Sequence, residues 1–71
     1  MAKLPRLTSK QILALLEAHG FDVDHVTGSH WILYHPTTER RVTVPFHTRT
    51  LPIGTIHLIL KQSGIPRDQF R

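Results

Sequence analysis

The feature that most constrains the fold is a pair of short polar turns that divides the middle of the chain into three strand-length segments. The first turn, at residues 27–29, reads Thr-Gly-Ser, and the second spans residues 36–40. The segments around them, residues 21–26, 30–35 and 41–46, carry β-branched and aromatic residues that strands favour. Turns this short connect antiparallel neighbours, so the sequence predicts one three-stranded antiparallel sheet.

The strand segments differ in how clearly they mark a buried face. In the first, Phe21, Val23 and His25 alternate with other residues, which predicts a strand with one face inward. The third has a clear apolar face that ends in Phe46, which we expect in the core, while Pro45 marks its end or a sheet edge. Apolar residues of the middle segment fall on both faces, so the pattern leaves its inward face open.

A helix is predicted on each side of the strands. A Thr-x-x-Gln capping box begins at Thr8 and Gly20 offers a natural stop, which predicts a first helix over about residues 9–19. Pro52 suits the first turn of a second helix, and Gly64 ends it. Both segments place apolar residues at helical spacing, which predicts an inward-facing stripe on each helix: Ile12, Leu13, Leu15 and Leu16 in the first, and Ile53, Ile56, Ile59 and Leu60 in the second.

The resulting order is α-β-β-β-α, an α+β arrangement in which two helices can cover one face of the sheet. This is the layout of the double-stranded-RNA-binding fold, and it leaves the other face to solvent or to a ligand. With 71 residues and no cysteine, the chain is expected to form a single domain over residues 1–71 that is stabilised by packing or a partner instead of disulfides.

The charge balance points to an anionic partner. The formal net charge is +4 with the six histidines neutral, and nucleic acid is the usual polyanion for such a chain. No signal-peptide-like apolar segment follows the basic N-terminus, and the apolar clusters are too short to span a bilayer. We therefore expect a cytoplasmic protein with no membrane partner.

The triplet Gly28-Ser29-His30 places a histidine at the mouth of the first predicted hairpin. In a small basic protein, a histidine in this position suggests a proton-transfer group held close to a polyanion. On its own the triplet also fits an ordinary surface turn, so its meaning depends on the rest of the chain.

Short motifs along nearly the whole chain occur in an order and spacing that resemble one family. They are Lys3-Leu4-Pro5-Arg6, Gly20-Phe21, Gly28-Ser29-His30, His35-Pro36, Arg41-Val42-Thr43-Val44-Pro45, Leu51-Pro52, Gly54-Thr55-Ile56, Ile59-Leu60 and Gln62-Ser63-Gly64-Ile65. Together they resemble the HicA (YcfA-like) toxins of bacterial and archaeal toxin–antitoxin modules.

This resemblance implies a ribosome-independent mRNA interferase with the double-stranded-RNA-binding fold. It also implies a HicB-type antitoxin that binds and covers the active site. The essential histidine of the family maps onto His30, and a recurrent loop histidine maps onto His47. Many relatives have a histidine or a polar residue after the triplet, whereas Trp31 follows it here, which bears on the shape of the RNA pocket.

RNA carries its own nucleophile, the 2′-hydroxyl, so cleavage needs a base for that proton and positive charge for the phosphorane. We expect His30 to be the base, giving a 2′,3′-cyclic phosphate and a 5′-hydroxyl, without a metal or a cofactor. Gly28 lets backbone N–H groups approach a phosphate, and the Ser29 hydroxyl can add a hydrogen bond. The proton donor is left open between His47 and solvent.

Aromatic and basic residues extend the predicted RNA surface. Trp31 and Tyr34 point to opposite faces of their strand, and each can stack on a base or pack, whereas Phe46 is the clearer core residue. Six basic residues are candidates for phosphate contacts, with the adjacent arginines the strongest: Lys3, Lys10, Arg40, Arg41, Lys61 and Arg67.

The remaining histidines have simpler expected roles. We expect His19 to pack at a helix boundary, His25 to be exposed, His35 to shape the second turn and His57 to face solvent. Their scattered spacing predicts no metal site.

Two alternatives remain open, a non-catalytic RNA-binding module of the same fold and a small interaction protein without a nucleic-acid role. A duplex-RNA binder of this fold uses a basic cluster at the start of its last helix. Residues 51–55 are uncharged, which disfavours that alternative. Cleavage that depends on His30 would separate a nuclease from a binder.

Overall fold

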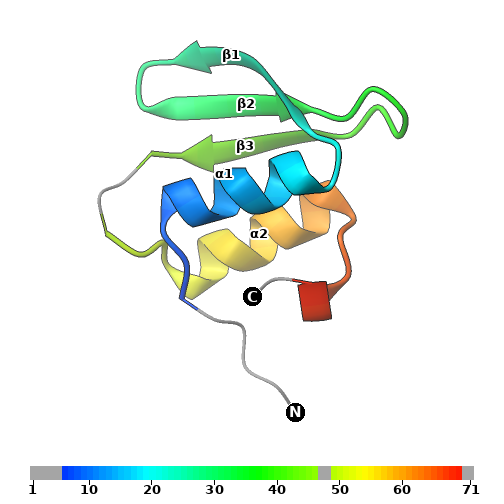
Figure 1. Cartoon of the computed structure of the whole chain (residues 1–71). Coiled ribbons are helices and arrows are strands. Elements are labelled where there is room, and N and C mark those ends of the chain that lie inside the picture. The colour runs from blue at the N-terminus through cyan, green and yellow to red at the C-terminus, as the bar shows by residue number, and fades with distance from the viewer. Residues whose placement is uncertain (1–5, 47–48, 70–71) are drawn as a thin grey trace.

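The computed structural model describes residues 6–46 and 49–69. The elements are listed in chain order: α1 (Ser9–Ala18), β1 (Asp22–Thr27), β2 (His30–Tyr34), β3 (Arg41–Pro45), α2 (Ile53–Ser63) and a 3-10 turn (Arg67–Gln69). The predicted α-β-β-β-α order and the single antiparallel sheet are confirmed (Figure 1).

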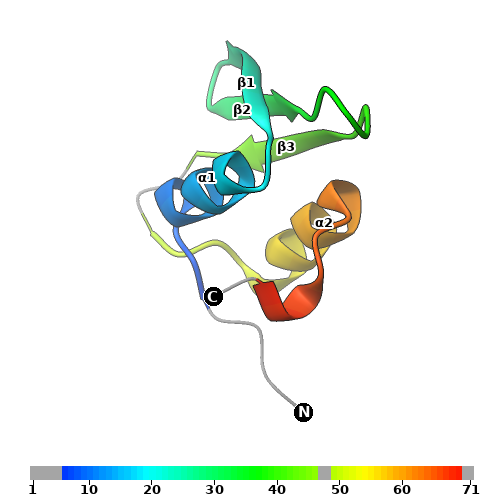
Figure 2. The ribbon, with the colours of Figure 1, turned by 45° about the vertical axis from the view of Figure 1, so that its right-hand side comes forward.

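The strands lie in the order β1-β2-β3, with β2 in the centre, and both helices lie on one side of the sheet (Figures 1 and 2). The helices pack mainly against β3. The core is formed by apolar residues from both helices, from β2 and β3 and from the connections: Leu7, Ile12, Leu13, Leu16, Phe21, Leu33, Val42, Val44, Leu51, Ile56, Ile59 and Ile65.

The register decides which face of β2 is inward, a point that the apolar pattern left open. Leu33 is buried opposite Val42, and Trp31 packs against the core opposite Val44, so these residues face the helices. The alternate residues of each strand then lie on the uncovered side of the sheet, which we call the open face. It is formed by Asp22, His25, Thr27, His30, Ile32, Tyr34, Arg41, Thr43 and Pro45.

Local capping signals determine where α1 begins and ends. The Thr8 hydroxyl accepts a hydrogen bond from the Gln11 N–H at 3.3 Å, and the Thr8 N–H donates to the Gln11 side chain at 2.9 Å, which confirms the capping box. The helix ends at Ala18, one residue before the predicted end, and Gly20 follows with φ +93°. This left-handed conformation suits glycine.

The second helix begins after Pro52 and ends at Gly64, whose φ of +72° is left-handed, as predicted. Ile56 and Ile59 are buried, but Ile53 in the first turn is 36% exposed, so the predicted inward stripe is wrong at its start. Fewer neighbours cover a side chain at the end of an element, which accounts for this exposure. No helix within the described ranges is long and apolar enough to cross a membrane.

The prediction that β1 has one face inward is wrong. Every residue of β1 is exposed, including Val23 at 38% and Val26 at 52%. The strand lies at the edge of the sheet farthest from the helices (Figure 1). A bulge between Val23 and His25 also moves these residues to opposite faces, because Val23 pairs with a helix-facing residue and His25 with Ile32 on the open face.

Phe46 was expected in the core but is 37% exposed. It directly follows Pro45, the last residue of β3, at the point where the chain leaves the sheet. Its ring stacks on Trp31 with 6.0 Å between the ring centroids. The two rings form a small apolar cover at the end of the sheet where β2 begins.

Candidate functional site

The β1–β2 hairpin presents the Gly-Ser-His triplet at one end of the sheet. Thr27 pairs with His30, so Gly28 and Ser29 form a two-residue turn. Gly28 has φ +55° whereas φ of Ser29 is negative, which is the combination found in type II′ hairpin turns. A Cβ atom at Gly28 would meet nothing within 4 Å, so the backbone conformation and not the space explains the glycine.

His30 is the first residue of β2 and lies on the open face between Thr27 of β1 and Pro45 of β3. Its side chain is exposed, and its imidazole makes no hydrogen bond or ion pair with any residue that the structure describes. Both ring nitrogens are therefore accessible to a ligand on the open face.

The surrounding contacts hold this turn to the rest of the fold. The Phe46 N–H donates to the Ser29 carbonyl at 2.6 Å, which extends the pairing beyond the end of β3. The buried Ser9 hydroxyl at the start of α1 donates to the Pro45 carbonyl at 2.7 Å. The hairpin is thus bonded directly to the end of β3, and β3 is in turn bonded to the start of α1.

Basic residues lie on the segments that lead into α1 and α2 and in the first turn of α1, whose Ser9 contacts the strand beside His30. A bridge joins Thr8 to Thr50, and the Ser9–Pro45 hydrogen bond links this region to the strand that pairs with His30. The exposed basic side chains on the segments joined by these contacts belong to Arg6, Lys10 and Arg49. Only Lys10 of these three was predicted from the sequence.

The other predicted phosphate contacts lie elsewhere. Arg41 pairs with Tyr34, four residues along β2 from His30, a separation of about 13 Å at ~3.3 Å per residue. Arg40 donates to the Gln62 carbonyl near the end of α2 at 3.3 Å, and Lys61 is exposed on the same part of that helix. Lys3 and His47 lie outside the described residues.

A charged cluster on the open face was not predicted. The His25 Nδ1 lies 2.8 Å from a carboxylate oxygen of Asp24, and Arg41 donates to the same oxygen at 3.4 Å. The Arg41 guanidinium also lies 4.8 Å from the centre of the Tyr34 ring. The His25 hydrogen bond, followed by Arg41, lowers the pKa of Asp24, while partial desolvation opposes the shift.

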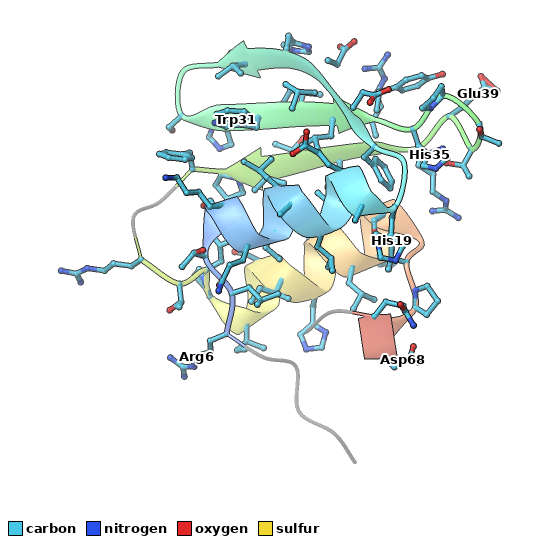
Figure 3. All side chains as sticks on the ribbon, viewed as in Figure 1. Arg6, His19, Trp31, His35, Glu39 and Asp68 are labelled. Atoms are coloured by element: carbon cyan, nitrogen blue, oxygen red, sulfur yellow. The ribbon has the colours of Figure 1, made fainter. Side chains whose placement is uncertain are left out.

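His35 has the structural role that the sequence predicted. Its Nδ1 accepts hydrogen bonds from the Thr37 and Thr38 N–H groups at 3.2 and 3.1 Å, so Nε2 carries the proton donated to the His19 carbonyl at 3.0 Å. The ring edge also packs on Phe21, with 5.0 Å between centroids. Figure 3 shows His35 between the β2–β3 turn and the end of α1.

The two remaining histidines also lie as predicted. The His19 ring is half-buried and its Nδ1 lies 2.9 Å from the Leu15 carbonyl, whereas His57 is exposed on α2. Within residues 6–46 and 49–69, no group of three or more histidine, cysteine, aspartate or glutamate side chains is arranged to hold a metal ion.

Comparison with known proteins supports the resemblance seen in the motifs. A model of the family described as HicA toxin of bacterial toxin–antitoxin matches residues 9–65, which extend from the first residue of α1 to just beyond α2. A comparison with curated proteins gives no match. The family match covers most of the chain and includes the whole His30 hairpin, so the chain belongs to the HicA toxin family of bacterial toxin–antitoxin systems.

Proposed function

We propose that the protein is a cytoplasmic endoribonuclease toxin that cleaves mRNA with His30 as its general base. The observation that carries this proposal is the exposed imidazole of His30, which has no partner among the described residues and lies beside a tethered turn. A general base needs at least one ring nitrogen free to reach the substrate, and neither nitrogen of His30 is bonded to a described residue.

The reaction follows from the chemistry of RNA. A ring nitrogen of His30 takes the proton of the 2′-hydroxyl, the 2′-oxygen bonds to phosphorus, and the bond to the 5′-oxygen breaks. The products are a 2′,3′-cyclic phosphate and a 5′-hydroxyl. Backbone N–H groups of the Gly28-Ser29 turn and the nearby Lys10 side chain are suited to the negative charge that develops on the phosphate.

The same hairpin is the surface that we expect an antitoxin to cover. A HicB-like protein that packs over residues 28–30 would exclude RNA without any change in the fold. The stacked rings of Trp31 and Phe46 offer apolar area at the edge of this surface.

The direct test compares RNA cleavage by three purified proteins: the wild type, His30→Ala and His57→Ala. His57 is a matched control because it is an exposed histidine on α2, on the covered side of the sheet. We expect the wild type and His57→Ala to cleave alike, and His30→Ala to be about 10²–10⁴-fold slower. Cleavage by His30→Ala at the wild-type rate would contradict the proposal.

The alternative of a non-catalytic binder gives a different result. A binder would retard RNA on a gel without cutting it and would lose affinity steeply with salt. The start of α2, where a duplex binder needs basic residues, carries no charged side chain between Leu51 and Thr55. Growth arrest on induced expression of the wild type, and not of His30→Ala, would favour the nuclease.

A further inference from the structure

The proposed reaction lacks a proton donor for the 5′-oxygen, and the register of the sheet brings a second histidine to the open face beside His30. His25 pairs with Ile32, and Thr27 pairs with His30, so the two histidines are diagonal neighbours on adjacent strands. Diagonal Cα atoms in an antiparallel pair lie about 7–8 Å apart. Two imidazole side chains that project from one face of the sheet at this Cα separation can both approach a single phosphate.

The two-residue turn sets this arrangement. Because only Gly28 and Ser29 separate the paired residues Thr27 and His30, alternation along β1 places His25, like Thr27, on the open face. The bulge lies on the other side of His25, at Asp24, and moves Val23 to the helix-facing side without changing the pairing of His25 with Ile32. The register of the hairpin therefore aligns His25 with His30.

The His25 ring is oriented by a carboxylate. Its Nδ1 lies 2.8 Å from the Asp24 carboxylate, which can only accept, so Nδ1 carries a proton and Nε2 is left for a ligand. Arg41 holds the same carboxylate oxygen from β3 at 3.4 Å. An imidazole oriented by a carboxylate at one nitrogen and free at the other is a common arrangement for proton transfer.

We propose that His25 is a second catalytic residue, the general acid of RNA cleavage, and that Asp24 is its positioning residue. This inference rests on the proposed function of His30. The His25 imidazolium gives its Nε2 proton to the 5′-oxygen as the P–O5′ bond breaks, while His30 accepts the 2′-hydroxyl proton as the O2′–P bond forms. Exchange with water then returns both rings to their starting protonation states.

The pH profile follows from these opposite roles. His25 must be protonated and His30 must be neutral, so the wild-type rate rises and then falls with pH, and His25→Ala loses the fall. The titratable and charged groups that face His25 are Asp22 and Asp24 on β1, His30 and Tyr34 on β2, and Arg41 on β3. The pH–rate profile of Asp24→Asn is the control for Asp24, which lies closest to the His25 ring.

The decisive test uses a short RNA in which sulfur replaces the bridging 5′-oxygen at the cleaved linkage. Thiols have pKa values near ~8.5, so the sulfur leaves as a thiolate and needs no general acid. We expect His25→Ala to be at least about 10²-fold slower than the wild type on natural RNA, yet within about threefold of it on the sulfur-containing RNA. Asp24→Asn should show a smaller loss with the same rescue, and its KM should be unchanged.

Each other outcome has a definite meaning. Equal impairment of His25→Ala on both substrates, or full activity on natural RNA, would overturn the role of His25. His30→Ala should stay slow on both substrates, because the sulfur does not replace a base. If the wild type cleaves neither RNA, the proposed function fails and this inference fails with it. Thermal unfolding of His25→Ala, an exposed substitution, should match the wild type and exclude a folding defect.

Discussion

The two hairpins of the sheet lie at opposite ends of β2 and are built in opposite ways. At the β2–β3 turn, the His35 side chain uses both ring nitrogens to bind the backbone, and Arg40 reaches the end of α2. This turn even holds Glu39 in a left-handed conformation with φ +61°. At the β1–β2 turn, the backbone is held but the His30 ring has no partner among the described residues.

The difference separates a histidine that belongs to the fold from one that is available to a ligand. Both are on β2 or directly after it, both lie beside turns and both lie in family motifs, so residue type and position alone do not distinguish them. Their hydrogen bonds do. Hydrogen bonding also distinguishes His25, which keeps one ring nitrogen free, from His35, which keeps none.

The largest expected contrast is between substitutions of these two histidines. His35→Ala removes three hydrogen bonds and the edge contact with Phe21, and should lower the free energy of unfolding by about 2 kcal/mol. His30→Ala should change it by less than about 0.5 kcal/mol. Urea unfolding of both variants measures these changes in the free energy of unfolding. Equal losses would contradict the view that His35 belongs to the fold and His30 does not.

A second contrast compares the glycines beside the two histidines. At Gly20, with φ +93°, a Cβ atom would lie 2.8 Å from the His35 ring, so Gly20→Ala should destabilise the fold by about 2 kcal/mol. At Gly28 the space is open and only the left-handed backbone, with φ +55°, opposes a side chain, so Gly28→Ala should cost about 1 kcal/mol. The same unfolding experiment ranks the two, and the reverse order would contradict the packing described for His35.

The sequence could predict those features that are decided by neighbouring residues. The Thr8 capping box, the stop at Gly64 and the role of His35 in its turn are all set within a few positions along the chain. The exposure of β1 depends on how far the helices extend across the sheet, and that of Phe46 on where the chain leaves the sheet, and no local pattern encodes either.

The residues of the candidate site also differ in whether neighbouring residues or the tertiary fold decide them. His30 could be proposed from the sequence because the Gly-Ser-His triplet is a local motif, and the family match includes it. The Asp24–His25–Arg41 cluster could not, because it needs both a bulge in β1 and the register with β3. The Thr8–Thr50 bridge, which joins the segments that carry Arg6 and Arg49, could not be predicted for a similar reason, because it links distant parts of the chain.

The smallest expected effect concerns Asp24 and the pH dependence of stability. Its folded-state pKa lies below the ordinary value of 3.8, chiefly through the His25 hydrogen bond. The stability that this pair contributes is therefore present above the unfolded pKa and is lost as the pH falls through the lower folded pKa. Between about pH 5 and about pH 3, the wild type should lose slightly more stability than Asp24→Asn.

The control for this experiment is Asp22→Asn, which removes an exposed carboxylate of the same strand. Its melting temperature should follow the wild type over the same acid range. A wild-type curve that coincides with that of Asp24→Asn would mean that the Asp24–His25 contact does not persist in solution.

The measurement that tests the central claim most directly is the chemistry of the RNA ends produced by the purified protein in the presence of a chelator. A general base that activates the 2′-hydroxyl predicts 2′,3′-cyclic phosphate and 5′-hydroxyl ends, formed without metal and absent with His30→Ala. Products with 3′-hydroxyl and 5′-phosphate ends, or cleavage that the chelator abolishes, would contradict this account of the His30 hairpin.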